Sequence, residues 1–543
     1  MTNRTRTDVL LIAGFCAFLF FYGLGQFGLI GADEPRYAQV AREMLERHDW
    51  ITPVLGGHPW LEKPPLYYWQ AMLAYSVFGV SDVAARVPAG IDATLLVIAV
   101  YLFFRRFRRG VEVDAALITA SCAGVIGYAR AASMDMALAA AFGVGMLAWW
   151  AWRESGKRMY LAVFYVCMGM GMLAKGPVAP FLAAAVIVVF ALAAREFRIV
   201  VRTLWPPGIL LFSAIALPWY VAAQMRNPQF FREFILQHNL ARFSSNLYHH
   251  PEPFWYYLPV TALAFVPWTV FVVAAFVESV RSWWRSRKSV SAEVDLELRF
   301  GLFVCCWLVV PVAFFSISQS KLPGYILPVI PAGAVLLADY LRRHLANEEE
   351  KSVSKGLALL HALVAAAPIV PSLLIAYVVT QHRLPADRPI LLALAVAFVL
   401  CAAIALTLVS RLRLRMLRFI TLIPVVLSVA AVLKLGAASI DPTLSARPLA
   451  AEIAAVETHQ LPLAVYGVPR EMEFGLTFYR NQTTVRYEWG RAPAEEHLLL
   501  APVAWKVNVA TQTVGRRVLL LGHYAPQNVD YYWVSAAAAS AIQ

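Results

Sequence analysis

Residues 389–410, PILLALAVAFVLCAAIALTLVS, form an apolar run that contains no charged side chain. About 20 such residues are enough to cross the hydrocarbon core of a bilayer as a helix. The rest of the chain has the same character, since 60% of its 543 residues are hydrophobic and only 15% are charged. We therefore expect an α-helical polytopic membrane protein and exclude a soluble globular one.

Thirteen apolar runs are candidates for transmembrane helices, with ends uncertain by about two to four residues. Lys175-Gly176-Pro177 interrupts one longer stretch and indicates either a tight loop or a re-entrant bend. The runs lie near 9–30, 87–104, 111–129, 134–152, 160–173, 177–194, 207–223, 256–277, 301–318, 325–341, 356–379, 389–410 and 418–437. The first is predicted to be a retained signal-anchor helix, because it lacks a small-residue cleavage site.

Clusters of arginine and lysine precede the first run and follow the even-numbered ones. Such residues are retained in short cytoplasmic loops, so the amino terminus is predicted to be inside. The net charge of +13 is explained by this topology and by attraction to anionic lipid, and we expect no nucleic-acid binding. Members of these clusters include Arg4, Arg6, Arg105, Arg106, Arg108, Arg109, Arg153, Arg198, Arg202, Arg281, Arg285, Arg342 and Arg343.

An odd number of spans places the carboxy-terminal residues outside, where the composition changes. A helical stretch near 449–457 alternates with strand-like runs at 463–466, 483–487, 498–501 and 518–521, punctuated by proline and glycine. We predict two domains, a transmembrane domain over 1–437 with an amphipathic outer loop at 31–86, and a small α/β domain over 438–543.

The outer loop holds charged residues that are costly at a membrane surface. Asp33-Glu34 follows the first run directly and precedes Pro35, Arg36 and Tyr37. Further along the loop, Glu62-Lys63 precedes Pro64-Pro65 and Tyr67, and the prolines restrict the directions of both charged side chains. Adjacent acids beside an arginine at this depth indicate a functional site.

Other outer segments add charged or polar groups, namely Asp135, Lys175, Lys321 and Tyr325. Each has a structural explanation, since a lysine can snorkel and Asp135 can pair with Arg130. These explanations do not account for acids, bases and histidines that collect outside while plain arginine clusters lie inside.

Together, these elements resemble those of integral-membrane GT-C glycosyltransferases, over nearly the whole chain and most strongly over residues 30–70. The match is closest to the bacterial aminoarabinose transferases that modify lipid A, which are related to protein O-mannosyltransferases. The resemblance implies transfer of 4-amino-4-deoxy-L-arabinose from undecaprenyl phosphate to a phosphate of lipid A, by a single inverting displacement. It also implies a bacterial inner-membrane location, a periplasmic active site and carboxy-terminal domain, and resistance to polymyxin and cationic antimicrobial peptides.

Breaking the bond between sugar and phosphate develops negative charge on the leaving phosphate and positive character on the sugar. Lys63 is the first candidate for the phosphate, and Asp33 and Asp135 are the carboxylates expected at the sugar. Whether Asp33 acts as a general base or orients a substrate depends on the acceptor and stays open. The residues expected to bind substrate are Glu34, Arg36, Glu62, Tyr67, Lys175, Lys321 and Tyr325.

No cofactor is required by this chemistry, although a divalent cation bound by Glu62 and His238, with His249 as a further ligand, would offset the phosphates. Expected partners are the undecaprenyl-phosphate-linked sugar, lipid A and membrane lipids, with the protein acting as a monomer. One alternative is a related enzyme that moves mannose or galacturonic acid onto protein or core oligosaccharide. A transporter or flippase is another, but the sequence has no convincing internal repeat and its acids lie at the outer ends of spans.

The thirteen-span topology is tested by a reporter fused after Ser439. We expect a reporter that works only in the periplasm to be active there, since an odd number of spans carries this position outside. Activity of a cytoplasmic reporter at the same position would overturn the count.

Overall fold

The computed structural model describes residues 3–234, 252–286, 292–346, 354–379, 387–410, 413–490 and 492–537. The chain divides into two compact units. The first contains Met1–Tyr22, Leu61–Tyr67 and Arg86–Val432. The second contains Gly23–Trp60, Tyr68–Ala85 and Leu433–Gln543. Each unit is therefore built from segments that are distant in the sequence.

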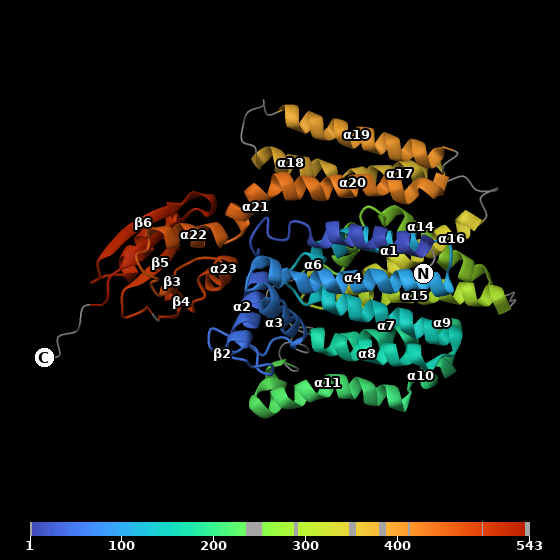
Figure 1. Ribbon diagram of the computed structural model, residues 1–543, viewed down its shortest axis with the longest axis horizontal. Coiled ribbons are helices and arrows are strands. Elements are labelled where there is room, and N and C mark those ends of the chain that lie inside the picture. The colour runs from blue at the N-terminus through green and yellow to red at the C-terminus, as the bar shows by residue number, and fades with distance from the viewer. Residues whose placement is uncertain are drawn as a thin grey trace. The chain divides into compact units, whose positions relative to one another are not determined.

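Helices make up the first unit, and α8 packs against both α7 and α11 while α9 packs against α15 (Figure 1). Its elements are α1 (Asn3–Cys16), the π-helix η1 (Ala17–Phe21), α4 (Asp82–Phe107), α5 (Glu112–Ser121), α6 (Ala123–Ala129), α7 (Asp135–Ser155), α8 (Arg158–Lys175), α9 (Val178–Ala194), α10 (Phe197–Thr203), α11 (Pro206–Arg226), α13 (Tyr257–Ala264), α14 (Thr269–Ser286), α15 (Ala292–Ile317), the 3-10 helix η3 (Pro323–Val329), α16 (Ile330–Ala346), α17 (Lys355–Ala366), α18 (Ile369–Val379), α19 (Asp387–Val409), the 3-10 helix η4 (Arg413–Met416) and α20 (Leu417–Ala431). The first four residues of α4 belong to the second unit.

Eight helices in the described part of the chain are long and apolar enough to cross a membrane, which makes the protein a multi-pass membrane protein. The number rises to 10 if the bent pairs α5 with α6 and α13 with α14 each count as one span. Helix α9 is a shorter apolar helix. The expected thirteen transmembrane spans are not reached by this criterion of helix length and apolar composition, and the number thirteen stays a prediction.

Two local features refine the expected spans. The helix predicted over residues 9–30 ends at Phe21, because Gly23 adopts a left-handed conformation at φ 71° and directs the chain into the second unit. Lys175-Gly176-Pro177 forms a tight turn between α8 and α9, in which Gly176 has φ 82°. Of the two alternatives for this interruption, the structure thus has the tight loop.

Large aromatic side chains fill the centre of the first unit. Trp149 and Trp150 on α7 are fully buried and stack on Phe303 of α15, with ring centroids 5.1 Å apart in both pairs. Phe190 of α9 meets the same ring edge-on at 5.7 Å. The indole N–H of Trp149 donates to Thr203 Oγ1 at 3.0 Å, so burial leaves this polar group satisfied.

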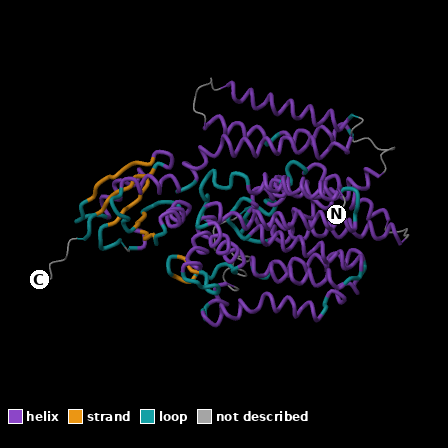
Figure 2. The backbone as a smooth tube through the Cα atoms, in the orientation of Figure 1, coloured by secondary structure: helices purple, strands orange, loops and turns teal. Residues whose placement is uncertain are grey.

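A five-stranded sheet forms the carboxy-terminal part of the second unit (Figure 2). Its strand order is β4-β3-β5-β7-β6, in which β3 pairs in parallel with β4 and β5 while β7 pairs antiparallel with β5 and β6. The strands are β3 (Leu463–Val465), β4 (Thr484–Arg486), β5 (His497–Pro502), β6 (Val518–Tyr524) and β7 (Val529–Val534). The four predicted strand runs are confirmed, whereas β7 was not predicted.

The remaining elements of this unit are helical apart from one short hairpin. They are α2 (Asp33–Glu46), the hairpin of β1 (Val54–Leu55) and β2 (His58–Pro59), α3 (Leu66–Phe78, whose first two residues belong to the first unit), the π-helix η5 (Val432–Gly436, which begins at the last residue of the first unit), α21 (Ala437–Leu444), α22 (Arg447–Val456), α23 (Arg470–Arg480) and α24 (Lys506–Gln512), with single-turn 3-10 helices at η6 (Tyr487–Trp489), η7 (Val503–Trp505) and η8 (Ala525–Gln527). Helix α22 confirms the helical stretch predicted near 449–457.

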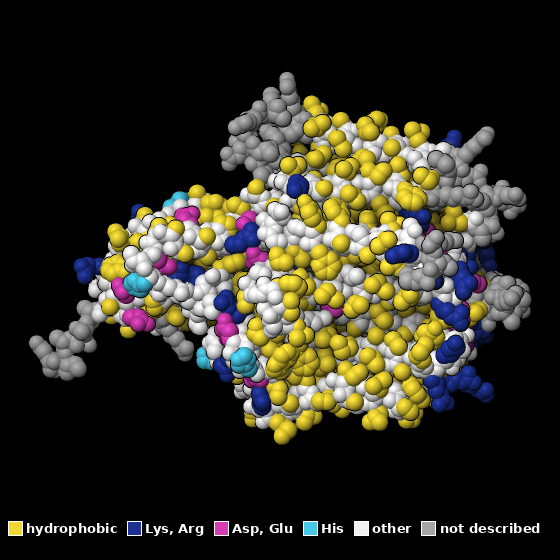
Figure 3. Space-filling model, in the orientation of Figure 1, with side chains coloured by type: hydrophobic (Ala, Val, Ile, Leu, Met, Phe, Trp, Pro, Cys, Tyr) yellow, Lys and Arg dark blue, Asp and Glu magenta, His cyan; other side chains and the backbone are white. Residues whose placement is uncertain are grey.

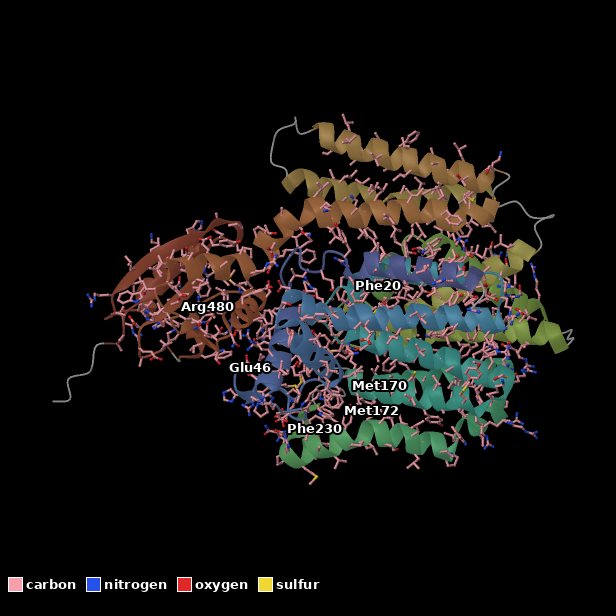
Figure 4. All side chains as sticks on the ribbon, viewed as in Figure 1. Phe20, Glu46, Met170, Met172, Phe230 and Arg480 are labelled. Atoms are coloured by element: carbon pink, nitrogen blue, oxygen red, sulfur yellow. The ribbon has the colours of Figure 1, made fainter. Side chains whose placement is uncertain are left out.

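Ion pairs help to join two of the three segments of the second unit, Tyr68–Ala85 and Leu433–Gln543. Arg447 contacts Asp82 at 2.8 Å and Asp441 at 2.6 Å, and Tyr479 donates to the same Asp82 carboxylate at 2.6 Å. Arg480, labelled in Figure 4, contacts Glu457 at 2.7 Å with both side chains at most 5% exposed. Such pairs are costly to break because one charge is then left buried.

His497 makes the stability of this unit depend on pH. Its ring is fully buried and shares a hydrogen bond with the Tyr487 hydroxyl, and burial lowers the pKa of the imidazole below its ordinary value. In the unfolded chain that pKa returns to about 6.5. The stabilisation is therefore present above about pH 6.5 and is lost as the pH falls below it, by at most about 1.4 kcal/mol per pH unit.

We expect hydrogen exchange in β5 and β7 of the full-length protein to accelerate between pH 7 and pH 5 after correction for intrinsic rates. His497→Gln removes this acceleration, whereas His459→Gln, at a side chain that is 65% exposed, leaves it in place. Equal pH slopes in the wild type and His497→Gln would contradict the assignment.

Candidate functional site

An ion pair links the ends of two neighbouring helices in the first unit. Asp135 is the first residue of α7 and Lys175 is the last residue of α8, and the Lys175 ammonium contacts the Asp135 carboxylate. Each residue has the charge that stabilises its own helix end. The two side chains are 15% and 16% exposed, so the pair is largely withdrawn from solvent and can still be reached.

Tyr325 completes this cluster from η3. The Lys175 ammonium lies 4.8 Å from the centre of the Tyr325 ring, which is within the range of a cation–π interaction. Gly324 keeps the backbone close to the carboxylate, since a side-chain carbon at this position would lie 3.0 Å from Asp135 Oδ1 and 2.8 Å from the Tyr128 hydroxyl. Three predicted site residues, Asp135, Lys175 and Tyr325, are therefore brought together.

Lys321 has a different environment from the other predicted lysines. Its ammonium donates to the backbone carbonyls of Ser318 at 2.6 Å and Glu252 at 3.0 Å, and the residue is 6% exposed. These bonds connect the segment after α15 to the segment before α13. This gives Lys321 a structural role in the described chain, beside the substrate role predicted for it.

Glu62, Lys63 and Tyr67 belong to the segment of the outer loop that forms part of the first unit. Glu62 and Lys63 are half-buried in the turn before Pro64-Pro65, while Tyr67 at the start of α3 is only 1% exposed. Their predicted roles toward substrate stay predictions.

Asp33 and Arg36 form an ion pair in the second unit. Asp33 opens α2, and its carboxylate accepts from the Arg36 guanidinium at 2.5 Å. The Asp33 side chain is 55% exposed, whereas Arg36 is 12% exposed. The largely buried Arg36 thus fixes the Asp33 carboxylate on its protein side, while the other side of the carboxylate remains open to solvent.

Three aromatic rings hold the Arg36 guanidinium in place. Its central carbon lies 5.0 Å from the ring centre of Tyr37, 5.2 Å from Trp60 and 5.5 Å from Phe474. Phe474 on α23 was not predicted, because nothing in its local sequence connects it with a residue more than four hundred positions earlier. The carboxy-terminal segment therefore helps to position Asp33 through Arg36.

Glu34 points into the second unit and is 7% exposed. Its Oε2 accepts from the backbone N–H of Ile30 at 2.9 Å, which satisfies a donor just before α2. The two adjacent acids are thus in different environments, with Glu34 buried and Asp33 accessible. A role for Glu34 toward substrate stays a prediction.

A metal site is not assembled in the described part of the chain, where no three histidine, cysteine, aspartate or glutamate side chains gather as ligands. Of the predicted ligands, Glu62 is described, whereas His238 and His249 lie outside the described residues. The divalent cation therefore stays a prediction.

Comparisons with a family model and with known proteins point to related glycosyltransferases. Residues 8–232 match the family model described as dolichyl-phosphate-mannose-protein mannosyltransferase. The chain is 31% identical over 350 residues to an undecaprenyl phosphate-α-4-amino-4-deoxy-L-arabinose arabinosyl transferase of Pseudomonas savastanoi, covering 64% of this chain and 63% of that protein. A protein of the same name from Pseudomonas paraeruginosa is 30% identical, covering 67% and 66%. The matched part thus spans slightly less than two thirds of the length of these relatives.

Solved structures share the fold over almost the whole chain. The crystal structure of ArnT from Cupriavidus metallidurans bound to undecaprenyl phosphate superposes with a TM-score of 0.73 at 23% identity, covering 97% of both chains. The apo structure of that protein gives 0.71 at 21% identity, covering 98% of both. At these levels of sequence identity, the structural similarity shows that this chain has the same fold.

The Lys175–Asp135 pair predicts non-additive effects on stability. Lys175→Met and Asp135→Asn each leave the partner without its counterpart, so the double variant should be less destabilised than the sum of the two, by about 0.5–3 kcal/mol. Unfolding of the detergent-purified protein followed by fluorescence measures this coupling. Lys157→Met, an exposed lysine at the other end of α8, is the control and should not couple to Asp135→Asn. Strict additivity of the first pair would contradict the interaction.

Proposed function

Because this chain belongs to the integral-membrane GT-C glycosyltransferases of the aminoarabinose transferase type, which are related to protein O-mannosyltransferases, we propose that it transfers 4-amino-4-deoxy-L-arabinose from undecaprenyl phosphate to a phosphate of lipid A. Its product would be a lipid A phosphate masked by an aminosugar, which lowers the affinity of polymyxin and other cationic peptides for the membrane.

The similarity to proteins named for this reaction is the observation that carries the proposal. A fold held in common with an ArnT structure that contains undecaprenyl phosphate supports the donor class. The half-buried Asp135–Lys175 pair beside Tyr325 supplies the charged groups that a phosphate-linked sugar requires.

The reaction is a single displacement at the anomeric carbon. An oxygen of the acceptor phosphate forms a bond to C1 of the sugar as the bond from C1 to the donor phosphate oxygen breaks, which inverts the configuration. Undecaprenyl phosphate leaves with the bonding electron pair and gains negative charge. Because a phosphate acceptor is already ionised near neutral pH, the attack needs no proton removal.

Asp33 is assigned to the sugar in this scheme. Its exposed carboxylate, fixed by Arg36, is suited to bind the sugar's ammonium group or to stabilise positive character on the ring. Asp135 is the second carboxylate assigned to the sugar, oriented by Lys175. Both roles are positional and electrostatic, so neither residue has to act as a base.

Cations are assigned to the two phosphates. Lys63 is the first candidate, because it directly precedes Pro64-Pro65, which restrict the direction of its side chain, and it is half-buried. Lys175, Arg36 and the Tyr325 hydroxyl assist, whereas Lys321, with two carbonyl partners, has one N–H left for substrate. Glu62, Tyr67 and Glu34 are the other residues proposed to bind substrate.

The proposed topology has thirteen spans, a cytoplasmic amino terminus, and a periplasmic reaction site and carboxy-terminal α/β domain in the bacterial inner membrane. The protein acts as a monomer in this proposal. A divalent ion held by Glu62 and His238 is an optional addition, which a chelator would remove.

A second candidate is transfer of mannose from a polyprenyl phosphate to protein, which the description of the matching family model favours. A hydroxyl acceptor would have to lose a proton during attack, so Asp33 would then act as the general base.

Purified full-length protein should add one aminoarabinose to lipid A when given the undecaprenyl-phosphate-linked sugar, as measured by the mass of the lipid product. Asp33→Asn is expected to lower the rate by at least about a hundredfold while the protein remains folded, because a transition-state charge loses its partner. Glu46→Gln is the control, since Glu46 lies at the other end of α2 with its side chain 49% exposed (Figure 4).

Transfer from polyprenyl-phosphate mannose to a peptide, without any mass gain on lipid A, would replace the first candidate by the second. An Asp33→Asn protein as active as the wild type would remove this residue from the site.

A further inference from the structure

The arginine end of the first unit contains a cavity of about 1430 Å³ (Figure 3, where Lys and Arg side chains gather at one end of the helices). It is bordered by α14, α15, α16, α17 and the turn at Arg109-Gly110. Its volume exceeds the roughly 300–1,000 Å³ of an ordinary small-molecule pocket. None of the residues assigned above to sugar transfer lines it.

Helix α14 presents one continuous face to this cavity. Its lining residues follow the three- and four-residue spacing of a single helical face, and they change from apolar to cationic along the helix. In order they are Thr269, Val270, Val273, Ala274, Val277, Glu278, Arg281, Ser282 and Arg285. From Val270 to Arg281 the helix rises about 16 Å, which is close to half of a hydrocarbon core of about 30 Å.

Positive charge dominates the polar part of the lining, where five arginines face two glutamates. Arg342 and Arg343 are fixed in place, because Arg342 contacts Glu297 and Asp339, and Arg343 contacts Glu278 at 3.0 Å and Asp339 at 3.2 Å. His344, the remaining titratable lining group with Tyr340, contacts Glu278 at 3.2 Å.

Three of the five lining arginines take no part in these ion pairs. Arg281, Arg285 and Arg109 are exposed, and toward the described residues they form no ion pair. The Arg109 side chain donates to the carbonyl of Arg105 at 3.2 Å, which leaves most of its guanidinium N–H groups available. The cavity is thus lined by ion pairs, two of them to the buried Asp339, and by accessible cations that carry its net charge.

We propose that this cavity is a binding site for an anionic phospholipid. The phosphate of the headgroup is bound by Arg281 and Arg285, with Arg109 opposite, and an acyl chain lies along Val270, Val273 and Val277. Basic pockets between transmembrane helices on the cytoplasmic side bind anionic lipid headgroups in this manner. The positive-inside topology predicts this end of the helices to be cytoplasmic.

The apolar half of the lining selects a lipid over a free phosphate. A free anion would use only the arginines and leave the exposed surface of Val273 and Leu360, which are 56% and 53% exposed, without a partner. A phospholipid covers both halves, because its phosphate can contact the arginines of α14 while its acyl chain lies along the valines of the same face.

Native mass spectrometry of the full-length protein with added phosphatidylglycerol tests the site. We expect one molecule to be retained, and Arg281→Gln with Arg285→Gln to weaken its binding roughly twenty-five-fold, at about fivefold per arginine. Arg198→Gln with Arg202→Gln is the matched control, since these exposed arginines have the same spacing on α10, outside the cavity. The control should change binding less than threefold, and both double variants should unfold at the wild-type temperature.

Comparison ligands identify the occupant. Phosphatidylcholine should be retained at least tenfold more weakly, and inorganic phosphate should not displace phosphatidylglycerol at equal concentration. Equal losses in the two double variants would reduce the effect to general surface attraction and overturn the proposal. Inorganic phosphate that displaces the lipid at equal concentration, or phosphatidylcholine that binds as tightly, would also overturn it.

Discussion

Hydrocarbon solvates neither backbone amides nor charges, and this constraint governs the first unit. Apolar helices satisfy their own backbone, so ionisable side chains need compensating partners, which helix ends with their dipoles supply most readily. The Asp135–Lys175 pair at one such end and the arginine-lined cavity are two consequences of the same rule. Chemistry in a protein of this kind therefore resides where helices begin and stop.

Much of the fold could be predicted from the sequence because apolar length and residue alternation are local signals. The helices of the first unit, α2, α22 and four strands of the sheet have such signals. Strand β7 was missed, since Tyr531 and Tyr532 follow an aspartate and lack flanking apolar alternation, and its strand character comes from pairing with β5 and β6. The early end of the first helix at Phe21 was missed because residues beyond it are apolar yet pack in the other unit.

For the candidate site, residue types could be predicted but their partners could not. Asp135 and Lys175 were both expected to face substrate, and their mutual pairing across forty positions is a property of how α7 packs on α8. Lys321 was expected to bind substrate, but its carbonyl partners are backbone groups, which carry no signal in the sequence. Likewise, adjacent acids such as Asp33 and Glu34 look equivalent in a sequence, and only the path of the chain before α2 separates them.

The discontinuous construction of the second unit has a consequence for biosynthesis. Helix α2 is made near the start of translation, whereas α23, which supplies Phe474 against Arg36 and accepts a hydrogen bond from Arg42 at the Phe478 carbonyl, is made near its end. Contacts of such long sequence separation form late. Every intervening membrane helix must be inserted before Asp33 acquires its final support. Assembly of the Asp33 environment thus requires synthesis as far as α23, and a nascent chain interrupted earlier carries the acid without this geometry.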